Sequence, residues 1–329
     1  MLDRHARAGR PAIDAGLVSD VRDEAQAAVP PVLFIVFNRP DLTAQTFEAI
    51  RQAQPRMLYV AADGPRVGRD EQSRCDETRR IATQVDWECE VRTLFAETNL
   101  GCRRGVQAAL DWFFNHEEEG IVLEDDCLPD PTFYPFVTEL LDRYRDDDRV
   151  MMISGDYFAG NTFPRETDYY FSRNSHIWGW ATWRRAWQRF DAELAAWPER
   201  RDTDWLIEIF DGDKSSAAHW SKIFDAVHRG DIDTWDYSWT FSMWNAGGIS
   251  IQPTVNLVTN LGFGPEATHT GDANAWQSNL ATAPMSFPLR HPSEVKQDAA
   301  RDHWTNLHVF GSRRPSLGRQ IWQRLRRGR

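Results

Sequence analysis

The chain has 329 residues, with 49 acidic and 38 basic side chains and a net charge of −11. Hydrophobic residues make up 41% and charged residues 26%, a globular composition that excludes a disordered chain, a collagen and a membrane bundle. We expect no nucleic-acid partner, because an acidic chain lacks the basic face that general nucleic-acid binding needs. The 15 tryptophans are unusual, since Trp serves where a flat apolar face and an N–H donor are both useful.

The beginning of the chain and its cysteines bear on location. Residues 1–29 show no sustained period and predict a poorly ordered leader. They contain no apolar run of the kind found in a secretory signal, and no stretch approaches the ~20 apolar residues of a membrane span. The cysteines form no Cys-x-x-Cys pair and no disulfide-rich pattern, so we expect a reducing, cytoplasmic setting. They are Cys75, Cys89, Cys102 and Cys127.

Strand and helix patterns alternate along the first half of the chain. The run VLFIVF predicts a strand buried on both faces, and Asp41 could cap the helix that follows it. Further strands are predicted at 57–62, 91–95, 120–123 and 150–154. Helices are predicted from about 41, over about 71–84, from 99 to 113, over 133–144, at 220–227 and from 235. This alternation predicts an α/β fold with a largely parallel central sheet flanked by helices.

Polar side chains follow three of the predicted strands. Arg39 follows the first strand, Asp63 the second, and Glu124-Asp125-Asp126 the fourth. Because ligands of parallel sheets bind at the carboxyl ends of the strands, we expect the functional site there. After about residue 155 the pattern loosens, and residues 260–280 have the polar, glycine-containing composition of a functional loop.

The acidic triplet directly after a buried strand is electrostatically unfavourable, because neighbouring like charges raise each other's pKa. Mg²⁺ or Mn²⁺ removes the repulsion, binds one or two carboxylates, and fills its other positions with water and phosphate oxygens. Such a metal neutralises the charge that develops on a diphosphate leaving group. The alternative is a solvated acidic turn that caps the next helix through Asp130 or Thr132.

The triplet and its surroundings also resemble a known family. The segment VLEDDCLPDPTF at 122–133 is similar to the Glu-Asp-Asp segment of N-acetylglucosaminyltransferase I, a nucleotide-sugar glycosyltransferase of GT-A fold. Related bacterial glycosyltransferase-like proteins share the WGWATW and ATHT segments. Further similar segments occur in the same order at 31–39, 177–183, 235–239 and 263–269. The resemblance implies a GT-A domain at 30–290, with a nucleotide-binding half to about 155, an acceptor half from about 156, and an extension at 291–329.

The resemblance also implies roles for the residues of the nucleotide-binding half. Asp126 would bind Mn²⁺ or Mg²⁺, and Glu124 and Asp125 would contact the ribose and nucleotide. Arg39 would bind base or phosphate, unless it is a surface arginine. Asp63 would contact the base, unless it only forms the turn before Gly64.

Other roles fall on the helix at 101 and on the acceptor half. Arg103 and Arg104 lie where a helix N-terminus suits a diphosphate, with a solvated first turn as the alternative, and we choose Arg104. Asp236 is the expected general base, with Asp233 as its rival. His269 would bind the metal or the diphosphate, or be structural. A sugar-stacking wall could include the tryptophans of the WGWATW segment, although we expect at least one of them to be buried. They are Trp178, Trp180 and Trp183.

Taken together, these expectations describe a metal-dependent glycosyltransferase of polysaccharide biosynthesis. It would move a sugar from a nucleoside diphosphate, with a UDP-sugar as the expected donor, to a hydroxyl of a glycan or lipid-linked glycan. Inversion is carried over from the resemblance. One alternative is a sugar-nucleotide hydrolase or nucleotidyltransferase, although Asn38-Arg39-Pro40 is not the Gly-rich, basic loop that a nucleotidyltransferase would show. The other is a non-catalytic GT-A-like protein that binds glycan or a partner.

The end of the chain differs in charge from the rest. Residues 313–329 contain seven arginines and no acidic residue, with Ile321, Trp322 and Leu325 among them. This composition predicts a short basic amphipathic tail that contacts the anionic inner surface of a membrane. A disordered, solubilising end is the alternative.

Overall fold

The computed structural model describes residues 28–263 and 275–312. The predicted leader up to residue 27, His269 and the basic tail at 313–329 lie outside the described residues. Within the described ranges, no helix has both the length and the apolar character needed to cross a bilayer.

An eight-stranded sheet organises the chain, in the order β3-β2-β1-β4-β8-β6-β9-β7. Its strands are β1 (Val32–Val36), β2 (Met57–Ala62), β3 (Glu90–Phe95), β4 (Glu119–Glu124), β6 (Val150–Ser154), β7 (Tyr169–Ser172), β8 (Trp180–Trp183) and β9 (Ile249–Pro253). The pairs β1–β2, β2–β3, β1–β4 and β6–β9 are parallel, whereas β8 and β7 pair antiparallel with their neighbours. A separate two-stranded sheet pairs β5 (Cys127–Pro129) with β10 (Val258–Asn260).

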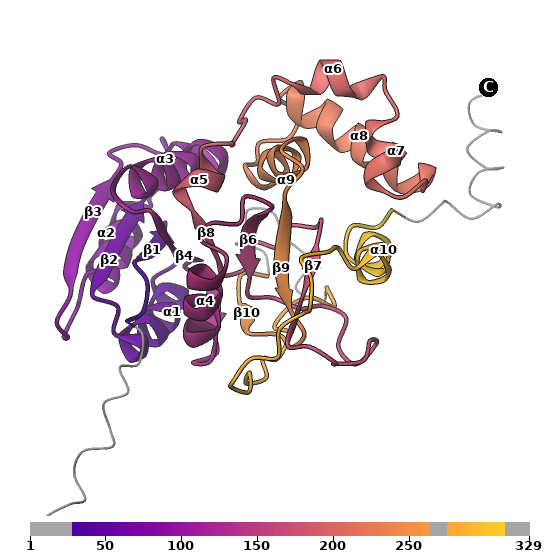
Figure 1. The fold of residues 1–329 in the computed structure, drawn as a ribbon. Helices are drawn as coiled ribbons and strands as arrows, with labels where there is room; N and C mark the ends of the chain where they lie inside the picture. Colours follow the sequence, from indigo (N-terminus) through magenta and orange to yellow (C-terminus); the bar gives the residue numbers. More distant parts are fainter. Residues whose placement is uncertain (1–27, 264–274, 313–329) are drawn as a thin grey trace, which may run out of the picture.

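Helices cover both faces of the large sheet, which confirms the predicted α/β class. The helices α1 (Pro40–Ala53), α2 (Gln72–Ala82) and α4 (Phe133–Arg143) pack on one face. The opposite face carries α3 (Gly101–His116), α5 (Arg184–Trp187), α6 (Trp197–Arg201), α7 (Trp205–Ile209), α8 (Lys214–His228) and α9 (Asp236–Asn245). In Figure 1, α1 and α4 lie on one side of the sheet, and α3, α5 and α9 on the other.

The first strand shows why this layering follows from the sequence. Phe34 of β1 packs into the core beneath α1 and α4, whereas Leu33 packs into the core beneath α3, and both are fully buried. A strand covered on both faces needs apolar side chains at successive positions, as its sequence predicts. The expectation for Asp41 is wrong, because α1 begins at Pro40 with Arg39 at its N-cap, and Asp41 lies in the first turn. Pro40 is suited to that first helical position by its restricted φ angle.

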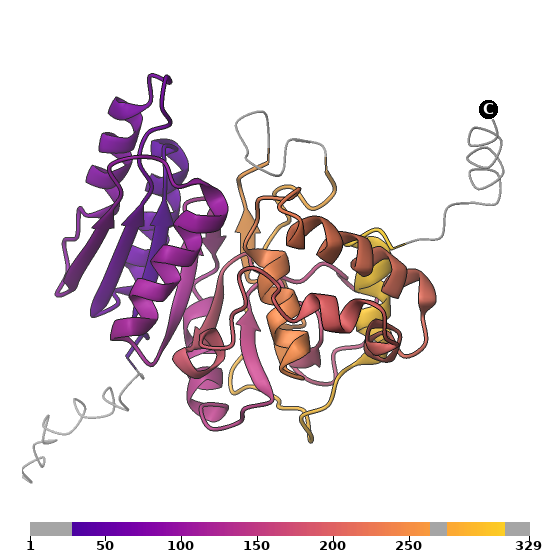
Figure 2. The ribbon, with the colours of Figure 1, turned by 90° about the horizontal axis from the view of Figure 1, so that it is seen from above.

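The two predicted halves share the one sheet, because β6, β7, β8 and β9 continue it beyond β4. Figure 2 shows the strands and helices of the nucleotide-binding half beside the mostly helical remainder of the chain. The tryptophan excess largely forms core on the α3 face. The tryptophans of that core are Trp180, Trp187, Trp197, Trp220, Trp235, Trp239 and Trp244.

Residues 291–312, predicted as part of an extension, pack against the sheet edge at β7. They include α10 (Ala299–His308), whose Asp302 is 5% exposed. The Asp302 carboxylate accepts hydrogen bonds from the Ser172 hydroxyl, the Arg173 N–H at 3.0 Å and the Gln297 amide at 2.7 Å. These bonds attach the C-terminal helix to the end of β7.

Candidate functional site

Three predicted site segments meet at one edge of the parallel half of the sheet. Arg39 follows β1, Asp63 follows β2, and Glu124 ends β4. Because β1 lies between β2 and β4, the strand order reverses at this point. Such a reversal opens a crevice at the carboxyl ends of the strands, where α/β sheets bind ligands.

Arg39 binds two members of the acidic triplet. Its guanidinium forms an ion pair with the Asp125 carboxylate and lies 2.9 Å from Asp126 Oδ2. The Arg39 side chain is 20% exposed and that of Asp125 only 3%, so neither is a surface group. Burial alone would lower the pKa of Arg39, but the charges of Asp125 and Asp126 raise it overall. Arg39 therefore remains a cation.

One arginine does not balance three carboxylates. Burial and the charges of Asp126 and Asp125 raise the pKa of Glu124 to about 8. Burial, opposed by Arg39, raises that of Asp125 to about 6. Burial is the main cause of both shifts, and the charge of Asp126 adds to each. A solvated acidic turn does not describe this triplet, because Asp125 is buried and the Asp126 side chain is 13% exposed.

A cavity of about 380 Å³ lies at the carboxyl ends of β1, β2 and β4. Arg39, Glu124 and Asp125 line it, and so do Asp63 and Arg66. The Arg66 guanidinium lies 5.4 Å from the centroid of the Phe37 ring, so the cavity combines a second cation with an aromatic face. We call this space the first cavity.

Asp63 organises the loop that starts α3. Its carboxylate accepts hydrogen bonds from the Gly64 N–H at 2.8 Å, the Leu100 N–H at 2.8 Å and the Gly101 N–H at 3.1 Å. The Asn99 side-chain amide also donates to it at 2.8 Å. Asp63 therefore lines the first cavity while it holds the helix start in position, and its predicted contact with a base stays a prediction.

A second cavity of about 520 Å³ adjoins the first, because Arg39, Cys102 and Glu124 line both. Asp126 and Asp236 line it too, which brings the expected metal ligand and the expected base to one space. Burial, and after it the charges of nearby carboxylates that include Asp126 and Asp236, raise the pKa values of Cys102 and Glu124.

Asp236 is held in position by its own helix start. It is the first residue of α9, and its Oδ1 accepts hydrogen bonds from the Thr234 hydroxyl and from the Tyr237 N–H at 2.9 Å. Its rival Asp233 lines a different cavity of about 430 Å³ together with Arg103 and Arg104. The structure thus separates the two candidate bases.

Arg104 does not join the other predicted nucleotide contacts. It is exposed on α3 and lines the cavity of Asp233, but neither the first nor the second cavity. Its neighbour Arg103 is engaged by Glu193, with 2.8 Å between guanidinium and carboxylate. The sequence predicts an anion site at this helix start, and in the structure both arginines line a separate cavity that shares Leu100 with the first.

The chain after β10 covers the end of the triplet. The Leu261 N–H donates to the Asp126 carbonyl at 2.8 Å. A Cβ added to Gly262 would lie 1.9 Å from Asp126 Oδ2, so only glycine fits against this carboxylate. The position of Asp126 therefore depends on a segment more than a hundred residues away in the sequence.

The three tryptophans of the WGWATW segment have different fates. Trp178 is partly exposed and lines the second cavity, with its ring at 5.1 Å from the Phe158 ring and 5.5 Å from the Phe263 ring. Trp180 and Trp183 are buried at 0% and 2% exposure. The expectation that at least one is buried is confirmed, and a wall formed by all three is wrong.

Sequence reasoning missed two residues of the second cavity, Asp156 and His176. Asp156 follows the end of β6, so the strand-end rule that selected Asp63 could have selected it. His176 lies in the loop between β7 and β8, where no local pattern marks it.

No metal site is preformed in the described parts of the chain, where no three His, Cys, Asp or Glu side chains are grouped to hold an ion. At the triplet, the Arg39 guanidinium lies against two of the three carboxylates. Any metal there would depend on Asp126 together with oxygens from a ligand and from water.

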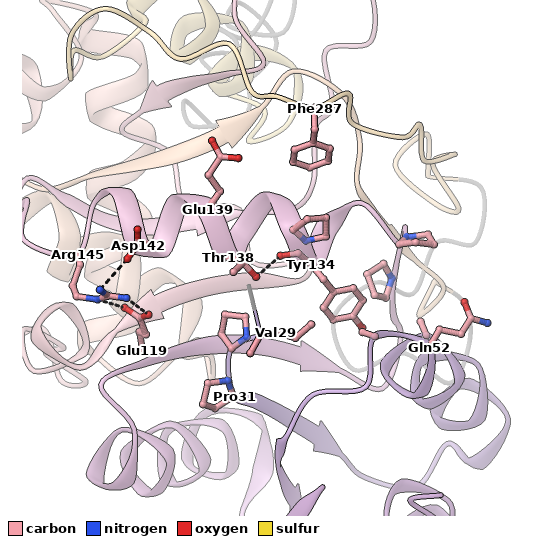
Figure 3. Close-up of a pocket in the computed structure, with 17 residues that line it drawn as sticks. Val29, Pro31, Gln52, Glu119, Tyr134, Thr138, Glu139, Asp142, Arg145 and Phe287 are labelled. Atoms are coloured by element: carbon pink, nitrogen blue, oxygen red, sulfur yellow. Dashed lines mark hydrogen bonds and ion pairs between the residues drawn. The ribbon is translucent and has the colours of Figure 1, made fainter. Parts of the chain in front are cut away.

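Another cavity, of about 780 Å³, lies at the opposite ends of the strands (Figure 3). Pro31 before β1 and Glu119 at the start of β4 line it, between α1 and α4. Its Arg145 binds Glu119 at 2.8 Å and Asp142 at 3.0 Å, as Figure 3 shows. Although larger, it lies away from the crevice where sheets of this class bind ligands.

Comparisons with known proteins give only distant likenesses. No protein-family model matches the chain, and no curated protein sequence matches it. Among solved structures, UDP-glucose pyrophosphorylase in complex with UDP-glucose aligns with a TM-score of 0.34 and 9% identity, over 68% of this chain and 90% of that one. HddC from Yersinia pseudotuberculosis aligns with a TM-score of 0.29 and 10% identity, over 47% and 77%. At these scores the likenesses assign neither a family nor an activity.

Proposed function

We propose that this protein is a metal-dependent glycosyltransferase. It would transfer a sugar from a nucleoside diphosphate, with a UDP-sugar as the expected donor, to a hydroxyl of a glycan or lipid-linked glycan, with inversion. The observation that carries the proposal is the junction of the two cavities at Arg39 and Glu124. A two-substrate transfer needs two adjoining spaces, and here the acidic triplet lies between them.

The first cavity suits the nucleotide. Arg39 and Arg66 line it with guanidinium groups that would face phosphate or base, although Glu71 already binds that of Arg66, and the Phe37 ring offers an apolar face beside Arg66. Glu124 and Asp125 line the same space and would contact the ribose and nucleotide. Asp63 would act there mainly through the loop that it holds.

The acidic end of the triplet fits a divalent cation. Arg39 pairs with two of the three carboxylates, and burial together with the charges of Asp126 and Asp125 raises the pKa of the third, Glu124. Asp126 would hold Mn²⁺ or Mg²⁺, with donor phosphates and water completing the coordination. When bound, the metal would neutralise charge on the departing diphosphate. His269, outside the described residues, stays a candidate for the same role.

Asp236 is the proposed base because it lines the second cavity with Asp126. Its carboxylate would take the proton of the acceptor hydroxyl as that oxygen attacks the anomeric carbon. The new carbon–oxygen bond forms while the bond from the anomeric carbon to the phosphate oxygen breaks. The nucleoside diphosphate leaves with that electron pair, and the sugar configuration inverts.

The test is UDP release from a panel of UDP-sugars with Mn²⁺, with and without a glycan extract as acceptor. Asp126→Ala should lose metal-dependent donor binding, whereas the exposed Asp148→Ala should keep it. Asp236→Asn should bind donor without transfer, and the matched Asp233→Asn should retain transfer. Transfer that survives in Asp236→Asn and fails in Asp233→Asn would reverse the assignment of the base.

Two results would overturn the proposal itself. If no nucleotide sugar binds in the presence of metal, the protein is not a transferase. If UTP and a sugar 1-phosphate yield pyrophosphate and a UDP-sugar, it is a nucleotidyltransferase. Donor binding without turnover under any acceptor condition would favour a non-catalytic glycan- or partner-binding protein.

A further inference from the structure

Two polar side chains are buried in the lining of the second cavity, apart in sequence from the acidic triplet. Asp156 is 1% exposed and His176 is 5% exposed, and both line the cavity. Asp156 follows β6, and His176 lies in the loop that leads to β8. They belong to neither the triplet nor the start of α9.

Among the described residues, neither side chain completes its hydrogen bonds. By distance and angle, Asp156 Oδ1 and both ring nitrogens of His176 have no hydrogen-bond partner there; the Asp156 backbone lies near His176 and partly offsets the lowering of its pKa by burial. The Asp156 Oδ1 and His176 Nδ1 atoms are 3.9 Å apart, which is too far for a hydrogen bond between them. Since buried polar groups in folded proteins are almost always hydrogen-bonded, such a cluster requires an explanation. A ligand in the cavity supplies one.

We propose that Asp156 and His176 form a hydroxyl-binding subsite for the acceptor sugar, with Trp178 as its apolar side. This inference rests on the proposed transferase function and names the part of the second cavity that holds the acceptor. The unpaired Asp156 oxygen and the two His176 nitrogens would be satisfied by sugar hydroxyls.

The chemistry of the pair favours hydroxyls over ions. A neutral imidazole offers one donor and one acceptor, and a protonated carboxyl also offers both, as a hydroxyl does. Burial lowers the pKa of His176 to about 4, so its imidazole is neutral near pH 7, and burial raises the pKa of Asp156 well above its usual range, which favours the protonated carboxyl. The neutral imidazole of His176 offers no positive charge to a phosphate or carboxylate ligand.

The surroundings of the pair complete a sugar-sized site. The His176 ring lies edge-on to the Phe158 ring at 4.9 Å, and Phe158 in turn contacts Trp178 at 5.1 Å. Trp178 is also held edge-on by Phe263, so its orientation is set by packing on two sides. A fixed aromatic ring beside hydroxyl-binding groups matches the two kinds of surface that a sugar presents.

The test measures binding of methyl glycosides of glucose, galactose, mannose and N-acetylglucosamine by saturation-transfer NMR. Each is measured with and without UDP and Mn²⁺, on the full chain. His176→Phe and Asp156→Leu remove the hydrogen-bonding groups, Asp156→Asn keeps a donor and an acceptor, and His219→Phe on α8 is the control outside both cavities. Thermal unfolding midpoints are recorded for every variant.

We expect at least one glycoside to bind the wild type, and both removing variants to weaken that binding by about tenfold or more. Asp156→Asn should retain most of the affinity, and His219→Phe all of it. His176→Phe should keep UDP binding and an unfolding midpoint at or above that of the wild type, because it removes unpaired buried nitrogens. A merely structural His176 would instead lose stability and leave glycoside affinity unchanged.

A deoxy series locates the contact. Each bound glycoside is compared with analogues that lack one hydroxyl. One deoxy analogue should bind the wild type more weakly than its parent glycoside does. That analogue should bind His176→Phe no more weakly than it binds the wild type, because the missing hydroxyl and the substitution delete the same hydrogen bond. Unchanged glycoside binding in both removing variants, or no glycoside binding to the wild type under either condition, would overturn the subsite. Glycoside binding that depends on His176 in a protein that does not bind UDP would support the subsite and overturn the transferase.

Discussion

Replacing Arg39 by alanine tests the electrostatic organisation of the site without any ligand. The substitution leaves Asp125, at 3% side-chain exposure, without its guanidinium partner, and it exposes Asp126 to the charge of its neighbours. Because these carboxylates cannot be solvated where they lie, the folded state must either hold unbalanced charge or take up protons.

The magnitude can be worked from the geometry. The Arg39 guanidinium and the Asp126 carboxylate are 2.9 Å apart. At an effective dielectric constant of about 20, unit charges at that distance attract by about 6 kcal/mol. Desolvation of the pair offsets much of this attraction, and removal of one partner of a buried pair costs about 3–5 kcal/mol in measured cases. We therefore expect Arg39→Ala to lower the free energy of unfolding by about 3–5 kcal/mol.

The assay is urea denaturation with a matched surface pair as control. Arg51 binds Glu48 at 2.7 Å, but the two side chains are 41% and 46% exposed. Arg51→Ala should therefore cost at most about 1 kcal/mol. An Arg39→Ala variant no less stable than Arg51→Ala, at equal m-values, would refute the view that Arg39 balances the buried charge.

A metal arm extends the same experiment to the proposed cofactor. Saturating Mn²⁺, at about 100 times its Kd, stabilises a folded protein that binds it by about 2.7 kcal/mol. If Asp126 binds the metal, Arg39→Ala should gain at least as much from Mn²⁺ as the wild type, because the guanidinium no longer competes. Stabilisation by Mn²⁺ that is equal in Arg39→Ala and Arg39→Ala/Asp126→Ala would exclude Asp126 as the ligand.

Three further predictions concern packing, pH and thiol chemistry. In Gly155→Ala the new Cβ would lie 2.5 Å from Val258 Cγ2, so overpacking should lower stability by about 1–3 kcal/mol, seen as a lower urea midpoint. Burial raises the pKa of Asp302 from 3.8 to about 6, so its contribution to stability is greatest below pH ~4 and declines as pH rises through 6. The unfolding free energy of wild type relative to Asp302→Asn should thus fall by up to ~3 kcal/mol between pH 4 and 7, and a flat difference contradicts the assigned burial. Burial and the charge of Glu124 raise the pKa of Cys102, so iodoacetamide at pH 8 should label it far more slowly in the folded than in the unfolded protein, as peptide mass spectrometry can show.

Much of the fold could be predicted because it leaves local signals. A strand buried on both faces needs an unbroken apolar run, and VLFIVF provides one for β1. The parallel arrangement then brings the strand ends together, which is why Arg39 and the triplet could be expected at one edge. The antiparallel insertion of β8 between β4 and β6 could not be predicted, because its pairing depends on strands distant in the sequence.

The positions of the three WGWATW tryptophans could not be predicted from the local sequence. Trp180 and Trp183 lie on β8 and enter the cores on opposite faces of the sheet. Trp178 precedes them, separated by Gly179, whose φ of +62° turns the chain before the strand begins. A Cβ at Gly179 would lie 2.7 Å from Val258 Cγ2, so the turn also depends on β10. The sequence presents three similar tryptophans, and only this tertiary turn leaves Trp178 in the cavity.

The positions of Asp156 and His176 likewise depend on tertiary structure. They differ in this from the acidic triplet. The acidic triplet is visible in the sequence because its unfavourable charges are adjacent in the chain. The Asp156–His176 pair is visible only once β8 has brought the end of β6 near the end of β4, because what marks it is a lack of hydrogen-bond partners. Under the proposed function, the acidic triplet and the Asp156–His176 pair have different roles in the second cavity. Charge gathers where a diphosphate would leave, while Asp156 and His176 would orient an acceptor through hydrogen bonds. The uncharged His176 would hold that acceptor without competing for the proposed metal or for Arg39.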